Sequence, residues 1–243
     1  MKLPVESVKS RQALKSFRAV KVRLGIGYLG LLLPFVLLIG SISCGSCEEV
    51  QSSVSNYYHT NMRDILVGIL FAVAMFFISY TGYDRRDDIA TNISAIAMIG
   101  VALFPTSVSS SELTYCIQNV IDNGIISYAH FIFATILFST LAYISLGLFT
   151  IYHKDNMSPQ KRTRNKVYQI CGYTIIGSII IIAIYVFVLK KKFPNLSNFN
   201  IIFWFEAIAL IAFGISWLVK GEALFRDSEK DEGIKSELAK STK

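Results

Sequence analysis

The sequence alternates between long apolar runs and short polar segments, and this alternation is its main structural signal. Each run is close to the ~20 residues that an α-helix needs to cross the hydrocarbon core of a bilayer. The runs are continuously apolar and lack the strict alternation of a membrane β-strand, so helices are predicted. The runs cover residues 24–43, 65–80, 89–104, 128–152, 168–189 and 201–219. The sequence therefore predicts an all-α integral membrane protein, a bundle of six transmembrane helices.

Polar segments flank these predicted spans at both ends of the chain. Residues 1–23 form a basic arm, with seven lysines and arginines against the single acid Glu6. Residues 220–243 mix charges of both signs with few apolar residues, a composition typical of segments without a packed core. The predicted organisation is a basic arm (1–23), a six-helix transmembrane domain (24–219) and a mixed-charge tail (220–243).

The composition supports the membrane assignment. Hydrophobic residues make up 53% of the chain and charged residues 17%, against about 25% charged in soluble domains. The net charge of +7 does not require a nucleic-acid partner, because 20 of the 24 lysines and arginines fall on one side of the predicted topology. By the positive-inside rule that side is cytoplasmic. We therefore expect a multi-pass protein of the cell membrane, embedded in the lipid bilayer, with both termini cytoplasmic. Its compact loops favour a bacterial inner membrane.

The least generic stretch, residues 55–64, places His59, Arg63 and Asp64 directly before the second predicted span. The topology puts His130 at the same outer side, and it puts Glu206 about 9 Å inside the sixth span at 1.5 Å per residue. A carboxyl at that depth is costly unless it is paired or faces a polar cavity. The hypothesis is an outward-facing polar pocket built by spans two, four and six. It would bind a lipid headgroup or a small polar ligand, with Arg63 engaging an anionic group.

These five candidate residues also allow a structural interpretation. If the second helix begins near Val54, His59 and Arg63 stack on one polar face. Glu206 is then expected to have a specific polar partner, either Arg63 or a histidine. Alternatively, the residues belong to the membrane interface: His59 in an aromatic belt, Arg63 reaching lipid phosphate, and His130 bonded to a backbone carbonyl.

A zinc site is the second interpretation. His59 and His130 with Asp64 or Glu206 would supply three ligands and leave a fourth position for water. The spacing Ser55-x-x-x-His59 at the start of a span resembles the alkaline ceramidase and progestin-receptor superfamily of seven-span membrane hydrolases, which hold zinc with a serine and histidines. The resemblance implies a zinc-dependent lipid hydrolase. It is partial, because that family has a late HxxxH pair, whereas this chain has three histidines and six predicted spans.

A wider resemblance rests on three stretches of the chain. They are Tyr58-His59-Thr60-x-x-Arg63-Asp64, Ala102-Leu103-Phe104-Pro105-Thr106 and Phe213-Gly214-x-Ser216-Trp217-Leu218-x-Lys220-Gly221. In these the chain resembles bacterial multi-spanning membrane proteins of no assigned function, which implies a membrane location and no activity. A channel or transporter would be expected to show inverted repeats or helices broken at the midplane, and Pro34 in the first span is the signal of that kind we find.

Three of the four cysteines lie on the outer side of the predicted topology. Cys44, Cys47 and Cys116 all fall there, where cysteines in a periplasm can oxidise. One bridge is possible, from either Cys44 or Cys47 to Cys116. The order Cys44-Gly-Ser-Cys47 just outside the first span looks like the quinone-coupled membrane thiol oxidases, which implies a thiol–disulfide oxidoreductase. Those proteins usually have a second cysteine pair, whereas here Cys116 alone is available. Nothing in the sequence indicates the oligomeric state.

Overall fold

The computed structural model describes residues 5–44, 47–82, 84–108, 116–117, 121, 123–150 and 159–224. The side chains of residues 5–17, 191, 194, 197 and 198 are not described. Most of the predicted basic arm's side chains and the tail beyond residue 224 therefore lie outside the described part. Within these ranges the regular structure is helical and contains no strand, which confirms the predicted all-α class.

Six long helices make up the described bundle, and each overlaps one predicted apolar run. They are α1 (Val5–Cys44), α2 (Arg63–Ser79), α3 (Arg85–Leu103), α4 (Gly124–Tyr143), α5 (Pro159–Ile184) and α7 (Ile201–Lys220). Short π-helices continue two of them, η3 (Ile144–Leu148) after α4 and η5 (Tyr185–Leu189) after α5. The remaining short elements are the 3₁₀ helix η1 (Ser55–His59), the single turn α6 (Lys190–Lys192) and the 3₁₀ helix η6 (Pro194–Phe199).

Local side-chain chemistry sets several helix ends. The Asp84 carboxylate accepts hydrogen bonds from the amides of Arg86 at 2.8 Å and Asp87 at 3.1 Å, and so caps the start of α3. Asn123 caps the start of α4 in the same way. α3 ends at Leu103, shortly before Pro105, because proline has no N–H to continue the helical ladder.

Four of the long helices are sufficiently long and apolar to cross a membrane. The segments are Arg18–Cys44, Gly124–Leu148, Pro159–Leu189 and Ile201–Lys220. α2 has 17 residues, which is about 26 Å of helix, and the first turn of α3 is charged. α1 continues without a break across residue 24, where the basic arm and the first span were predicted to meet.

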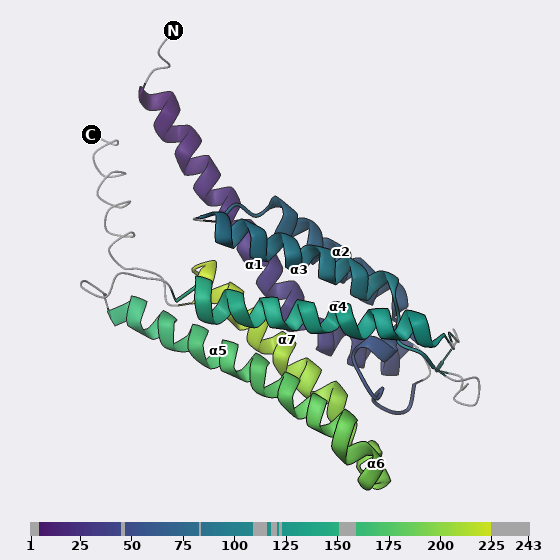
Figure 1. Ribbon diagram of the computed structural model, residues 1–243. Helices are drawn as coiled ribbons and strands as arrows, with labels where there is room; N and C mark the ends of the chain where they lie inside the picture. The colour runs from purple at the N-terminus through teal and green to yellow at the C-terminus, as the bar shows by residue number, and fades with distance from the viewer. Residues whose placement is uncertain are drawn as a thin grey trace.

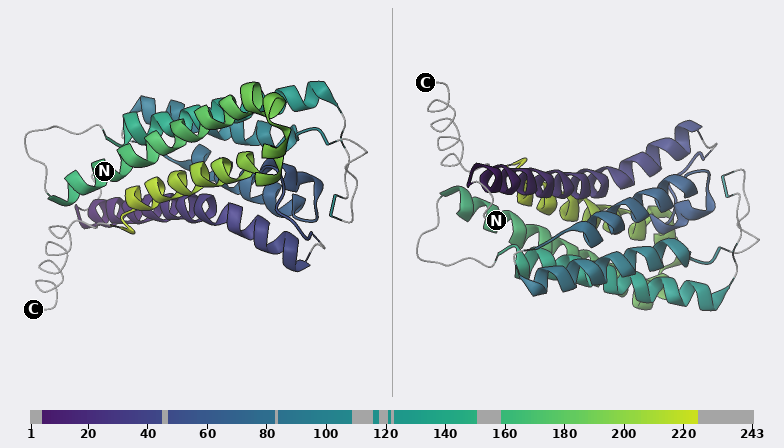
Figure 2. Two further views of the ribbon diagram at one scale, coloured as in Figure 1. Left: turned by 90° about the horizontal axis from the view of Figure 1, so that it is seen from below. Right: turned by 90° about the horizontal axis from the view of Figure 1, so that it is seen from above.

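The long helices close a ring that follows the order of the chain (Figure 1). Each packs against the next one, and α7 packs against both α5 and α1. Two further views show the same side-by-side arrangement (Figure 2). α7 is also the most buried of the four apolar spans, with 56% of its most apolar window inside the bundle. Residues on α7 are therefore the best placed to reach several neighbours at once.

Small residues allow α1 and α7 to approach closely. A Cβ atom added to Gly214 would lie 2.5 Å from the Leu31 backbone nitrogen and 2.7 Å from the Gly27 carbonyl oxygen. A Cβ on Gly27 would lie 2.7 Å from the Leu218 side chain. Small residues at such seams let two helix backbones meet, which is a common way to pack helices in a bilayer.

Trp217 lies at the centre of an aromatic cluster toward the end of α7. It is fully buried, and its ring centroid lies 5.1 Å from Phe77, 5.2 Å from Tyr80 and 5.2 Å from Phe149. These rings come from α2, from its C-terminal end and from the segment after α4. The cluster joins distant parts of the chain around α7, and edge-to-face contacts of this kind add to the stabilisation from burial.

The two ends of the bundle differ in chemistry. We name one the disulfide end, which holds the Cys47–Cys116 disulfide and η1. We name the other the basic end, which holds Arg23, Arg164 and Lys220. Figure 2 shows the end of α7, in yellow, beside the start of α5 at the basic end, with the start of α4 at the opposite end.

We predict that Gly214→Ala destabilises the protein by about 1–3 kcal/mol, because backbone atoms of α1 occupy the space the methyl group needs. The thermal midpoint of the purified protein in detergent, followed by circular dichroism, measures the effect. Gly177→Ala in α5 is the matched control, since nothing lies within 4 Å of its added Cβ. Equal midpoints for the two variants would contradict the close α1–α7 seam.

Candidate functional site

The segment of residues 47–62, between α1 and α2, lies at the disulfide end of the bundle. Thr60 follows η1 with an extended backbone, at φ −103° and ψ −180°. Its hydroxyl donates to the Tyr57 carbonyl at 2.8 Å and accepts from a backbone amide two residues later at 3.1 Å. α2 begins at Arg63. The predicted continuous helix through this stretch is therefore wrong, and His59 and Arg63 belong to different elements.

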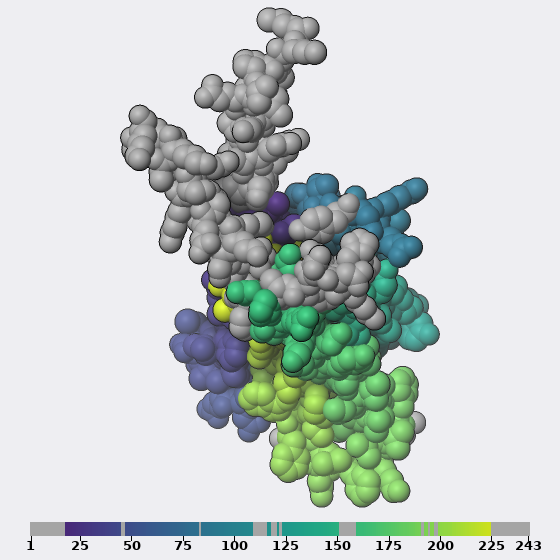
Figure 3. Space-filling model, turned by 90° about the vertical axis from the view of Figure 1, so that its left-hand side faces the viewer, coloured from purple at the N-terminus to yellow at the C-terminus, as the bar shows by residue number. Residues whose placement is uncertain are grey.

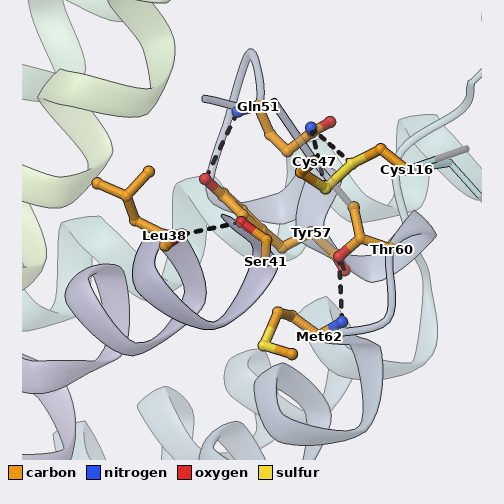
Figure 4. The surroundings of a disulfide bond; sticks show 8 residues. All are labelled: Leu38, Ser41, Cys47, Gln51, Tyr57, Thr60, Met62 and Cys116. Carbon is orange, nitrogen blue, oxygen red and sulfur yellow. Dashed lines mark hydrogen bonds between the residues drawn. A yellow bond between two sulfur atoms is a disulfide. The ribbon is translucent and has the colours of Figure 1, made fainter. Parts of the chain in front are cut away.

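A disulfide ties this segment to the loop that follows α3 (Figure 4). Cys47, and not Cys44, pairs with Cys116, and Cys44 is a free, exposed thiol. The Gln51 amide nitrogen Nε2 points at the bridge, 3.3 Å from the sulfur of Cys116. The Gln51 backbone N–H donates to the Tyr57 hydroxyl at 3.5 Å. Burial raises the pKa of Tyr57, so this hydroxyl stays protonated at neutral pH.

Residues at the start of α7 donate hydrogen bonds to backbone carbonyls of the same segment. The Phe203 amide donates to the Ser52 carbonyl at 3.1 Å. The Asn200 side-chain amide donates to the Val50 carbonyl at 3.1 Å. These contacts satisfy backbone groups that no helix or sheet can pair, and they fix the segment against α7.

Glu206, on the second turn of α7, makes the shortest of these contacts. Its carboxylate oxygen Oε2 accepts a hydrogen bond from the Val54 amide at 2.7 Å, and the Ser55 amide also bonds to the carboxylate. Both amides stand at the N-terminal end of η1, where no helical carbonyl can accept from them. The partner of Glu206 is thus backbone, and the expectation that it pairs with Arg63 or a histidine is wrong.

The two candidate histidines bind the chain on either side of Pro105. His59 is fully buried, and its Nε2–H donates to the Thr106 carbonyl at 2.8 Å. His130 is 3% exposed, and its Nδ1–H donates to the Phe104 carbonyl at 2.7 Å. A carbonyl can only accept, so each of these nitrogens carries the proton. The histidines therefore complete the backbone hydrogen bonding where α3 ends, as the structural interpretation of His130 anticipated.

Arg63 and Asp64 lie at the exposed start of α2. The Arg63 guanidinium stacks over the Tyr58 ring, 4.7 Å from its centroid, and donates to the Tyr58 hydroxyl at 3.0 Å. Tyr58 itself is buried, at 8% exposure. The five candidates therefore separate into two buried histidines with the partly buried Glu206, and an exposed pair on α2.

A cavity of about 50 Å³ lies between the helices at this end, partly open to the outside. Four of its lining residues carry polar groups, and they are Ser55, Tyr58, His130 and Glu206. The rest of the lining is apolar and comes from Leu33, Val54, Leu66, Val67, Leu70, Val101, Ala102, Pro105, Ala134, Leu137, Phe138 and Leu210. The structure thus brings His130 and Glu206 together on one cavity, with contributions from α1, α2, α3, α4 and α7, while His59, Arg63 and Asp64 are outside its lining.

The predicted zinc ligands do not form a metal site. Among the residues that the structure describes, no three His, Cys, Asp or Glu side chains are placed to hold one ion. Of the predicted set, His59 uses its Nε2–H on the Thr106 carbonyl, and Asp64 is exposed at the start of α2. The donor set His59, His130 and Asp64 therefore does not fit zinc.

The sequence did not single out Tyr58 or the aliphatic lining of the cavity. Aromatic residues such as Tyr58 are common at span ends, whereas the structure makes Tyr58 the link between the cavity and Arg63. The aliphatic residues resemble any others in an apolar helix, so no local signal distinguishes them.

We predict that Cys47→Ser and Cys116→Ser each destabilise the protein by about 2–4 kcal/mol, because both open the same covalent loop. The double variant should be no less stable than either single one when thermal midpoints are compared. Cys44→Ser is the control, since this thiol is free and exposed. If Cys44→Ser were as damaging as the other two, the assigned pairing would be wrong.

Comparison with known proteins finds no relative of this chain. No protein-family model, no curated protein and no solved structure matches the chain. The resemblances drawn from short motifs therefore stay predictions, and a function has to be argued from the cavity and its surroundings.

Proposed function

We propose that this chain is a six-span protein of a bacterial inner membrane, with both termini cytoplasmic, that binds a lipid headgroup in the cavity at its disulfide end. Four helices have the length and apolarity to span a membrane. α2 and α3 pack against each other and against α1 and α4 respectively, so they complete the same bundle. The two differing ends support the orientation, because basic residues favour the cytoplasm and disulfides form on the oxidising side.

The observation that carries the proposal is a carboxylate on an otherwise apolar cavity. Glu206 bonds to backbone amides through Oε2, and its side chain also lines the cavity beside His130. A carboxylate offers hydrogen-bond acceptors to a ligand. A ligand that fits this carboxylate must bring hydrogen-bond donors, as a primary ammonium group does.

Arg63 supplies the complementary charge beside the cavity. Its guanidinium lies over Tyr58, and the Tyr58 side chain lines the cavity. Arginine binds phosphate through paired N–H donors. An ammonium near Glu206 and a phosphate near Arg63 together describe a phosphoethanolamine headgroup. The apolar lining suits the carbon atoms between and beside these charges, and the surrounding bilayer accommodates the acyl chains.

The proposed topology predicts opposite sides for two engineered thiols. In a Cys44→Ser background, Ser110→Cys should react with a membrane-impermeant maleimide in intact cells, and Ser10→Cys should react only after the membrane is opened. Positions 10 and 110 precede the first predicted span and follow the third. Labelling of both positions from the same side would contradict six spans with cytoplasmic termini.

Headgroup recognition predicts a preference for phosphatidylethanolamine over phosphatidylcholine, whose quaternary ammonium has no N–H to donate. Native mass spectrometry of the full chain in detergent, titrated with each lipid, measures both affinities. We expect Glu206→Gln to weaken phosphatidylethanolamine binding about tenfold, because a charge-assisted hydrogen bond is lost. The amide oxygen of the new Gln can still accept from Val54. Arg63→Gln should weaken both lipids equally, because they share the phosphate.

Glu49→Gln is the matched control, since Glu49 is an exposed acid near the same end of the bundle. If Glu206→Gln and Glu49→Gln had equal effects, or if the wild type bound the two lipids equally, amine recognition by Glu206 would be wrong. Soluble phosphoethanolamine serves as a third probe. Binding as tight as that of the lipid would show that the site takes the free polar molecule, the other ligand class expected from the sequence.

A further inference from the structure

The outer face of α3 carries a regular row of side chains that the described part of the chain leaves largely uncovered. α3 packs against α2 and against α4, and the row lies away from both contacts. Its members are Ile89, Asn92, Ile96 and Leu103, which are exposed, and Ile99, which is partly buried. Figure 3 looks onto the basic end and shows the blue surface of this region at one edge of the molecule.

The spacing of the row is that of a seam between two helices. Successive members are three, four, three and four residues apart, a heptad pattern that keeps them on one line along the helix. Two helices that carry such a row pack side by side, with the side chains of one seated between those of the other. A single polar residue inside an otherwise apolar row fixes the register of the pair. In α3 that residue is Asn92.

Asn92 differs from the other polar side chains in this part of α3. Thr91 and Ser94 are buried, and their hydroxyls donate to carbonyls one turn earlier in the helix. Ser94 also shares a hydrogen bond of 2.9 Å with the Thr140 hydroxyl on α4. The exposed Asn92 carboxamide makes no hydrogen bond to any residue that the structure describes. Its donors and its acceptor are therefore available to a partner.

Lipid is a poor partner for this face of α3. Acyl chains have no hydrogen-bonding groups, and the short Asn92 side chain cannot reach the headgroups as a lysine does. Asn92 lies four residues beyond Asp88, about 6 Å further along the helix. α3 is also not among the four described helices that are long and apolar enough to cross a membrane. Another protein surface suits this face better than hydrocarbon does.

We propose that the row on α3 is the contact between two copies of this chain, and that Asn92 of one copy bonds to the same residue of the second. Two copies inserted with one orientation are related by an axis along the membrane normal, which sets their α3 helices parallel and equal residues opposite each other. A carboxamide has donors and an acceptor, so it is complementary to itself. The inference rests on the proposed membrane crossing of α3.

Cysteine crosslinking in native membranes tests where the two copies meet. In a Cys44→Ser background, which removes the exposed free thiol, Ile96→Cys should form a disulfide-linked dimer under mild oxidation with copper phenanthroline. Ile180→Cys on α5 is the matched control, because Ile180 is 52% exposed and Ile96 is 64% exposed. Equal crosslinking at the two positions would indicate random collision and overturn the contact. So would the absence of a dimer with Ile96→Cys.

Substitutions of Asn92 test the hydrogen bond between the copies. The full chain, labelled with donor and acceptor dyes, is reconstituted in phosphatidylcholine vesicles at several protein densities, and energy transfer gives the dimer fraction. We expect Asn92→Leu to weaken association about fivefold to tenfold, and Asn92→Gln to retain part of it. Thr135→Val on α4 is the control and should associate like the wild type, because the exposed Thr135 hydroxyl bonds to its own helix at 2.7 Å.

The thermal midpoint separates a loss of association from a loss of folding. At a density where both proteins are monomeric, Asn92→Leu should keep the wild-type midpoint, since no described residue bonds to this side chain. Wild-type protein that stays monomeric at every density, or folded Asn92→Leu that associates like the wild type, would overturn the proposal. Thiol labelling of Ser10→Cys and Ser110→Cys tests the topology itself, so a failure of the topology is distinguishable from a failure of the contact.

Discussion

The contact between the Glu206 carboxylate and the Val54 amide holds together the least regular part of the molecule. An amide at the start of a short helix has no helical acceptor, and Val54 is buried, so leaving its amide unpaired would be costly. The carboxylate supplies that acceptor at 2.7 Å. Neighbouring bonds from Asn200 and Phe203 attach the same segment to α7. Because one helix makes all three contacts, the position of α7 sets the position of η1, and with it the shape of the cavity.

The need to pair backbone groups that no helix satisfies also explains the buried histidines. Pro105 ends α3 and leaves carbonyls without helical donors, and an unpaired carbonyl in an apolar surrounding is costly. His59 and His130 donate to the carbonyls of Thr106 and Phe104. Both rings therefore stabilise a break in the backbone. His130 combines this role with a place on the cavity.

The helices could be predicted from the sequence because each apolar run is long and is separated from the next by a polar segment. It also identified Glu206, since a carboxyl within an apolar helix needs a partner whatever the fold. That partner could not be predicted, because Val54 lies 152 residues away in the chain. The helix breaks at Thr60, whose hydroxyl binds the Tyr57 carbonyl in competition with the helical hydrogen bonds. The periodicity of apolar residues does not reveal such a contact. The choice of Cys47 over Cys44 likewise depends on the position of Cys116 in the folded chain, which the sequence does not show.

The bundle core and the cavity depend on different interactions. The glycine seam joins α1 to α7, and the Trp217 cluster joins α2 and the segment after α4 to α7. The cavity uses a segment that one disulfide and a few hydrogen bonds to α7 hold in place. A ligand that engages Glu206 therefore interacts with the group that orders η1. By linkage, whatever orders residues 47–62 must favour binding, and binding must favour the ordered segment to the same extent. For the proposed ligand, the disulfide then contributes to the affinity of the cavity as well as to the stability of the bundle.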